Sequence, residues 1–96
     1  MRGQPAFAPI GAHTSNGSLA SAVTLTAPAG AEYLMMQALG QNIRYRLDGT
    51  NPTASVGFQL ANGDTVTLPV RAGDTVRIIQ EAATATLQYQ WGTGSW

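Results

Sequence analysis

Hydrophobic and polar residues alternate in short segments from Leu19 onward, and turn-forming residues separate these segments about every ten residues. A period of two is typical of strands with one buried face, and regularly spaced turns are typical of a sandwich or barrel. The sequence therefore predicts an all-β fold: a small single-domain β-sandwich of about seven short, mainly antiparallel strands. We expect these strands at residues 21–26, 33–39, 42–47, 56–60, 65–70, 75–80 and 84–91.

The alternation also predicts which side chains point into the core, because successive strand residues face opposite sides. In the segment 42–47, Ile43, Tyr45 and Leu47 share the inward face, and Arg44 and Arg46 share the outward face. The same rule places further side chains inside, namely Val56, Phe58, Val66, Leu68, Val70, Leu87, Tyr89 and Trp91. Residues 31–39 also tolerate a helix, but the segment is short and bounded by glycines, which favours a strand.

Both ends of the chain lack this alternation. Residues 1–18 hold two prolines and several glycines, with Phe7 and Ile10 as the large apolar residues, so we expect an extended N-terminal arm. Residues 19–92 then form the sandwich domain, and residues 93–96 form a C-terminal tail ending in Trp96. The arm is either an inert leader or a segment that lies on a partner, and Trp96 either dangles or docks, as tryptophans at binding hot spots do.

The 96 residues suffice for one domain, and many of the hydrophobic residues are alanines, so the core is small. We therefore expect help from partner subunits, as in a homo-oligomer. Five arginines, no lysine and five acids give a net charge of zero, which argues against nucleic acid and anionic membranes as partners. The sequence has neither a long apolar run nor a signal-peptide pattern, so we expect synthesis in the cytoplasm.

Few residues are candidates for chemistry. The chain has no cysteine, and its single histidine, His13, lies in the predicted arm, where a solvated loop residue, a partner contact and a metal or catalytic group are the alternatives. Asp48, Asp64 and Asp74 each adjoin a glycine, which indicates turn formation, with a weak Ca²⁺ site as the alternative. Phosphate-binding glycine motifs are absent. We expect no enzyme and no cofactor.

Arg44 and Arg46 are the charged residues of most interest because they share one outward strand face. They are solvated, or pair with Asp48 and a cross-strand acid, or bind carboxylates of a partner. The sequence thus proposes a partner interface that consists of Phe7, Ile10, Arg44, Arg46 and Trp96.

Residues 41–57 read QNIRYRLDGTNPTASVG and resemble a run found in small proteins of tailed bacteriophages. The similarity continues through residues 76–87 and covers about residues 33–91, without the arm and the tail. It implies a virion-associated protein of the capsid-decoration or cement type. A shorter similarity links Ile43-Arg44-Tyr45, Asp48-Gly49-Thr50 and Pro52-Thr53 to immunoglobulin-like accessory domains of chitin-degrading enzymes.

The preferred interpretation is a structural protein of a bacteriophage virion that decorates or cements the capsid surface through symmetric contacts. Its partners are then the major capsid protein, or another virion protein, and further copies of itself. The alternative is a carbohydrate-binding or accessory β-sandwich, in which Tyr33, Tyr45, Tyr89, Trp91 and Trp96 stack on sugars. Because Tyr45, Tyr89 and Trp91 fall on predicted inward faces, the pattern favours the virion protein.

Overall fold

The protein is described here from a computed structural model, which places the backbone of residues 6–95 and the side chains of residues 8–94. The described chain is all-β, and its eight strands are β1 (Ala6–Asn16), β2 (Val23–Thr26), β3 (Tyr33–Leu39), β4 (Ile43–Arg46), β5 (Phe58–Leu60), β6 (Thr65–Pro69), β7 (Thr75–Gln80) and β8 (Thr86–Ser95). Within residues 6–95 there is no helix long and apolar enough to cross a membrane.

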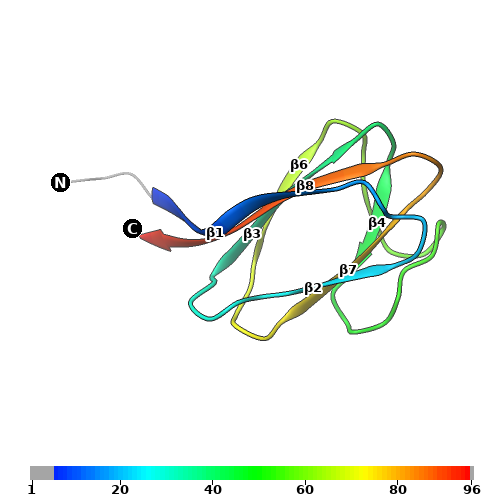
Figure 1. The fold of residues 1–96 in the computed structure, drawn as a ribbon. Coiled ribbons are helices and arrows are strands. Elements are labelled where there is room, and N and C mark those ends of the chain that lie inside the picture. The colour runs from blue at the N-terminus through cyan, green and yellow to red at the C-terminus, as the bar shows by residue number, and fades with distance from the viewer. Residues whose placement is uncertain (1–5, 96) are drawn as a thin grey trace.

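The strands form two four-stranded antiparallel sheets. Sheet A has the order β1-β8-β3-β6, and sheet B has the order β2-β7-β4-β5. Strand β1 pairs with β8, β2 with β7, β3 with β6 and β4 with β5, so the chain forms one long antiparallel ribbon that is rolled over itself. This strand order is that of a jelly roll. Figure 1 shows the two layers, with β1 and β8 in one and β2 and β7 in the other.

The core lies between the inner faces of the two sheets. Leu34 and Met36 of β3 come from sheet A, while Ile43 of β4 and Ile78 of β7 come from sheet B, and all four are almost fully buried. Half-buried side chains complete the core at its margins, namely Val23, Val66, Leu68, Val70, Tyr89 and Trp91. The predicted β-sandwich is confirmed, as is the strand at residues 33–39, and Ile43 and Tyr45 face inward as the alternation requires.

The expected extended arm is not confirmed. Residues 6–16 form β1, an edge strand of sheet A that pairs with β8 from Ala6↔Ser95 to Asn16↔Leu87. The period of two is hidden because the register shifts between Ile10 and Thr14. Gly11, with φ of +73°, lies within this bulge. Residues 93–95 likewise continue β8, so they are not a separate tail, and Trp96 lies outside the described residues.

Strands β1 and β8 extend past the end of β3 as a two-stranded ribbon, seen on the left of Figure 1. Where β3 leaves β8, the side chain of Glu32 takes over as a hydrogen-bond acceptor for β8. Its carboxylate accepts hydrogen bonds from the Thr93 hydroxyl and, at 3.1 Å, from the Gly94 amide. These bonds hold the pKa of Glu32 below its usual value. The ribbon is thus tied to the sandwich.

Deletion of residues 1–16 tests whether β1 is part of the fold. Without β1, strand β8 becomes an unprotected edge and loses its ladder hydrogen bonds and the cover of Ile10. We expect the melting temperature to fall by about 10 °C or more, since each 1 kcal/mol lost lowers it by about 4–8 °C in a domain of this size. The matched control is deletion of residues 1–5, which should melt like the full chain. Equal melting of both deletions would show that β1 is a dispensable arm.

Candidate docking site

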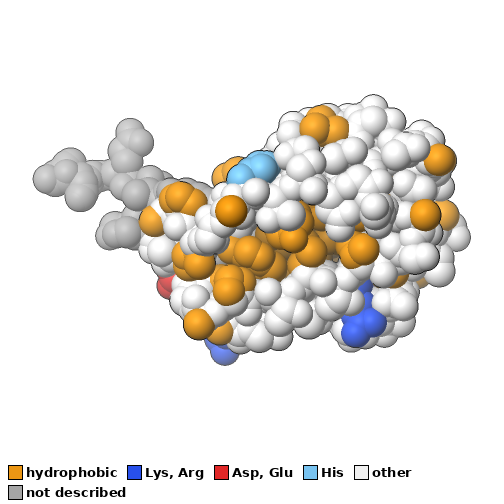
Figure 2. Space-filling view, viewed as in Figure 1, with side chains coloured by type: hydrophobic (Ala, Val, Ile, Leu, Met, Phe, Trp, Pro, Cys, Tyr) orange, Lys and Arg blue, Asp and Glu red, His pale blue; other side chains and the backbone are white. Residues whose placement is uncertain are grey.

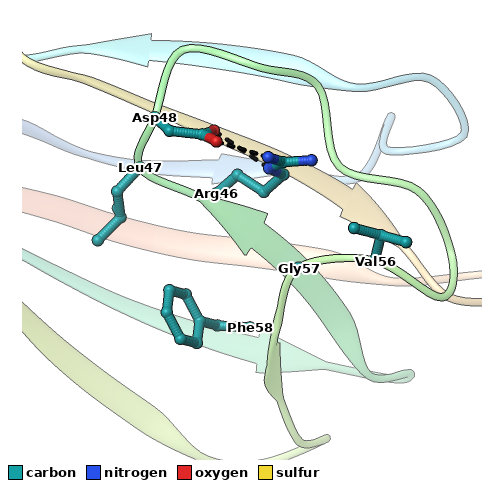
Figure 3. A pocket seen from close by; sticks show the side chains of 6 residues that line it. All are labelled: Arg46, Leu47, Asp48, Val56, Gly57 and Phe58. Atoms are coloured by element: carbon teal, nitrogen blue, oxygen red, sulfur yellow. Dashed lines mark hydrogen bonds and ion pairs between the residues drawn. The ribbon is translucent and has the colours of Figure 1, made fainter.

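The main exposed apolar feature of the described surface lies around the loop between β4 and β5. The side chains of Leu47, Val56 and Phe58 are 51%, 50% and 61% exposed. Together with Arg46, Asp48 and Gly57 they line an open hollow of about 470 Å³. In Figure 3 the side chains of Leu47 and Phe58 flank this hollow, and the Arg46–Asp48 pair lies at its rim. Leu47, Val56 and Phe58 are called the apolar cluster below.

The sequence pattern predicted burial of all three residues, and this expectation is wrong. Phe58 lies opposite Tyr45 in the β4–β5 ladder, so both side chains point to the same side of sheet B. Their rings pack at a centroid distance of 5.6 Å. Strand β5 is the outermost strand of sheet B, and Phe58 remains exposed there. Burial of the Tyr45 ring raises the pKa of its hydroxyl.

The loop that carries the cluster is held by local hydrogen bonds. Thr53 and Val56 form an isolated bridge, with N···O distances of 3.0 and 3.3 Å between their backbones. The Thr53 hydroxyl also accepts a hydrogen bond from the Val56 amide at 3.0 Å, and Pro52 is buried. Gly57 has φ of +136°, and a Cβ there would lie 3.0 Å from the carbonyl oxygen of Tyr45. The loop is therefore fixed closely against β4.

The two arginines of β4 interact within the chain. Arg46 pairs with Asp48 through Nε···Oδ1 and Nη2···Oδ2 contacts of 3.1 and 2.5 Å, and the Asp48 carboxylate also accepts the Thr50 amide. Hydrogen bonding to Arg46 is the main reason why the pKa of Asp48 is lowered. This is the pairing with Asp48 that the sequence offered as one alternative, and it places Asp48 in a turn-stabilising role.

Arg44 has the cross-strand acid that the sequence anticipated, and that acid is Glu81. The Nε of Arg44 lies 2.5 Å from Oε2 of Glu81, and its Nη1 donates to the Gly57 carbonyl at 3.0 Å. The amides of Gln59 and Asn42 also donate to Glu81, at 2.8 and 3.4 Å. The pKa of Glu81 is lowered, and the hydrogen bond from Gln59 is the largest cause. Arg44 thus connects β4, the end of β7 and the loop before β5.

Of the remaining proposed interface residues, the structure describes Ile10 and the backbone of Phe7. Ile10 of β1 is half-buried, and its Cδ1 reaches the turn at Gly30. The backbone of Phe7 pairs with Gly94, but its side chain lies outside the described part, as does Trp96. Of the three proposed residues whose side chains are described, Arg44 and Arg46 lie on β4 of sheet B and Ile10 lies on β1 of sheet A. The apolar cluster was missed because the pattern gave the direction of each side chain and not its depth.

The candidate catalytic and metal-binding groups are separated. His13 lies on β1, with its Nε2 2.7 Å from Oε1 of Gln88. The Asp74 carboxylate accepts the Arg71 amide at 2.9 Å and so supports a turn. Within the described residues no three histidine, cysteine or acidic side chains are grouped so that they could hold a metal ion. The described surface thus presents an exposed apolar cluster and hydrogen-bonded turns.

The aromatic side chains of β8 do not form a flat row. Tyr89 and Trp91 are half-buried against the core, with ring centroids 6.4 Å apart and planes at 82°. Tyr45 is buried between the sheets. Sugar binding by stacking needs exposed ring faces, and these three rings lie on the inner sides of their sheets.

Comparisons with known proteins do not identify a function for this chain. No protein-family model matches the chain, and no curated protein matches it. A solved structure described as "Bacillus endospore appendages form a novel family of disulfide-linked pili" covers 94% of this chain and 91% of its own, with 20% sequence identity and a TM-score of 0.44. A similarity at this level carries no argument about function.

Replacing each arginine of β4 by alanine separates the two ion pairs. Arg44→Ala removes contacts to Glu81 and to the Gly57 carbonyl, whereas Arg46→Ala removes one pair at an exposed loop. We expect the melting temperature to fall by more than about 5 °C for Arg44→Ala and by less than about 3 °C for Arg46→Ala. Thermal melts of both purified variants measure this, and similar losses in the two would contradict the bridging role of Arg44.

The lowered pKa values of Glu81, Asp48 and Glu32 predict how stability depends on pH. A carboxyl group whose pKa is lower in the folded state stabilises the fold above its unfolded pKa of about 4, and this contribution is lost as the pH falls through the folded value. The melting temperature should therefore drop between about pH 5 and pH 2.5. In Glu81→Gln this drop should be smaller, and a profile parallel to that of the unchanged protein would refute the role of Glu81.

Proposed function

We propose that this protein is a non-enzymatic structural component of a bacteriophage virion, which decorates or cements the capsid by docking its apolar cluster on the major capsid protein or another virion protein. The observation that carries the proposal is the exposure of Leu47, Val56 and Phe58 around one hollow. Large apolar side chains gathered at one exposed place are typical of interaction sites. An aromatic ring beside a hollow is also typical of the anchors that dominate binding energy.

The rigidity of the loop supports docking. A segment that is already fixed loses little conformational entropy on binding, so more of the contact energy contributes to affinity. Here Pro52, the Thr53–Val56 bridge and the Arg44 bond to the Gly57 carbonyl fix the loop before any partner arrives. The Arg46–Asp48 pair supplies a polar rim around the apolar centre, which is how protein interfaces are built.

A virion role is also supported by analogy with other proteins, through one sequence run and the strand order. The run at residues 41–57, which resembles small proteins of tailed phages, contains the loop with Leu47 and Val56. The jelly-roll strand order also occurs in viral capsid domains. Jelly rolls include lectins as well, so the fold alone does not choose between the two functions. The inward positions of Tyr45, Tyr89 and Trp91 remove three of the five aromatic residues on which the carbohydrate-binding alternative relies.

Co-sedimentation with capsids purified from the phage that encodes this sequence tests the proposal. We expect saturable binding of the unchanged protein and at least tenfold weaker binding of Phe58→Ser, because a hot-spot aromatic contributes about 1.4 kcal/mol or more. Leu47→Ser is the second variant, since it changes the other side of the hollow without removing the Phe58–Tyr45 contact. Ala54→Ser is the matched control, because it places a hydroxyl in the same loop and removes no large side chain.

Melting curves establish that each variant is folded before it is mixed with capsids. The proposal fails if the unchanged protein does not co-sediment at micromolar concentration. It also fails if folded Phe58→Ser and Leu47→Ser bind as tightly as Ala54→Ser.

A further inference from the structure

Arg77 of β7 is a half-buried arginine to which the described chain offers no carboxylate. All five acidic residues of the chain belong to the described part, and the ion pairs there join Arg44 to Glu81 and Arg46 to Asp48. In Figure 2 a blue patch lies below β2 and β7, and no red side chain adjoins it on this face. The sequence suggested Arg44 and Arg46 for a partner's carboxylate, whereas the structure leaves Arg77 available for one.

The guanidinium group of Arg77 is only partly satisfied by the described chain. Its Nη1 donates a hydrogen bond to the side-chain oxygen of Asn51 at 2.8 Å, and its Nε is buried without a hydrogen-bond partner. Its Nη2 also lacks an acceptor in the described chain, but unlike Nε it remains accessible to solvent. A guanidinium has five N–H donors, and its attraction to an anion is stronger at a half-buried position than in open water. Arg77 is therefore suited to bind an anion that approaches from outside.

A second arginine strengthens this preference for an anion. Arg46 lies directly opposite Arg77 in the β4–β7 ladder, so the two side chains share one row on the outer face of sheet B. Opposite Cα atoms in such a ladder are about 5 Å apart, and like charges in this position repel each other. Asp48 pairs with Nε and Nη2 of Arg46, and in Figure 3 the third nitrogen of that guanidinium points away from Asp48. Two positive charges thus face one negative charge, and a second carboxylate would relieve the repulsion.

The two arginines adjoin the apolar cluster. Arg46 lines the same hollow as Leu47 and Phe58, and Asn51, which binds Arg77, belongs to the loop that carries Leu47. A partner that covers the hollow therefore also meets Arg46 and comes next to Arg77. A protein surface can present one carboxylate beside apolar side chains. The backbone of a nucleic acid instead presents a dense row of phosphates, which needs more cations than this surface has.

We propose that Arg77, together with Arg46, binds an aspartate or glutamate carboxylate of the partner protein that docks on the apolar cluster. This inference rests on the proposed docking function and specifies the chemistry of the partner, which carries an acidic side chain next to an apolar anchor. Arginine binds carboxylates through paired N–H groups, so the contact fixes the orientation of the partner in addition to its contribution to affinity. Arginine is also enriched at protein interfaces and at their binding hot spots.

Co-sedimentation of charge variants with the same capsids tests the contact. We expect Arg77→Gln to bind about tenfold more weakly at about 50 mM NaCl, because it loses the hydrogen bonds of a charged donor to the carboxylate. At about 500 mM NaCl the difference should become smaller, since salt screens the attraction. Arg71→Gln is the matched control, because it removes the same charge from the exposed turn between β6 and β7 and should bind like the unchanged protein. Melting curves establish that both variants are folded.

A chemical cross-link identifies the group that Arg77 contacts. The chain contains no lysine, so Arg77→Lys introduces a single lysine side chain at the site and keeps its positive charge. A carbodiimide condenses a lysine amine with a carboxylate in contact with it, and the carbodiimide takes up the water as it becomes a urea. We expect mass spectrometry of the capsid complex to find the new lysine joined to an aspartate or glutamate of a capsid protein. Arg71→Lys is the matched control and should give no such cross-link.

The carboxylate contact and the apolar docking site fail in different ways. If Phe58→Ser weakens capsid binding while Arg77→Gln binds like Arg71→Gln, the carboxylate contact is refuted and the apolar docking site stands. The contact is also refuted if Arg77→Lys gives no more cross-links to capsid carboxylates than Arg71→Lys. An unchanged protein that does not co-sediment with capsids refutes both.

Discussion

The packing of the inner faces of the two sheets against each other is the interaction on which the rest of the structure depends. Leu34 and Met36 on one side and Ile43 and Ile78 on the other remove the apolar face of each sheet from water. This packing is possible because the chain forms a rolled ribbon in which the first strand pairs with the last. Once the inner faces are fixed, the alternation of each strand decides which residues reach the two outer faces.

The two outer faces and the loops then differ in charge and in the exposure of apolar side chains. Sheet B carries the arginines, and Arg44 uses its charge within the chain, where it joins Glu81 to the loop before β5. The described strands of sheet A contain no Asp, Glu, Lys or Arg. The outermost strand of sheet B leaves Phe58 exposed. The main exposed apolar feature of the described surface is therefore the apolar cluster beside β5.

Much of the fold could be predicted from the period of two. The alternation in Ile43-Arg44-Tyr45-Arg46 placed two residues inside and two outside, and the structure agrees. The pattern could not reveal β1, because Pro9 and the bulge after Ile10 interrupt its period and its partner strand is far away in sequence. Pairing over such a distance depends on the roll of the whole chain, and no local pattern encodes it.

The candidate site could be predicted only in part, for the same reason. Leu47 continues the alternation of β4 beyond the end of that strand, and Phe58 begins a strand at the margin of sheet B. Alternation gives the side of the sheet to which each residue points, but burial also requires that the opposite sheet extends over it. Leu47 and Phe58 are exposed because that cover is lacking, and this depends on how far each strand runs.

Hydrogen–deuterium exchange of the protein, free and bound to capsids, tests the central claim most directly because it locates the docking surface without any substitution. If the apolar cluster is the docking site, peptides that contain residues 47–58 should gain the largest protection on binding, while β2 should exchange as in the free protein. Protection confined to other segments, or exchange at residues 47–58 that is unchanged when the protein is bound, would contradict the account.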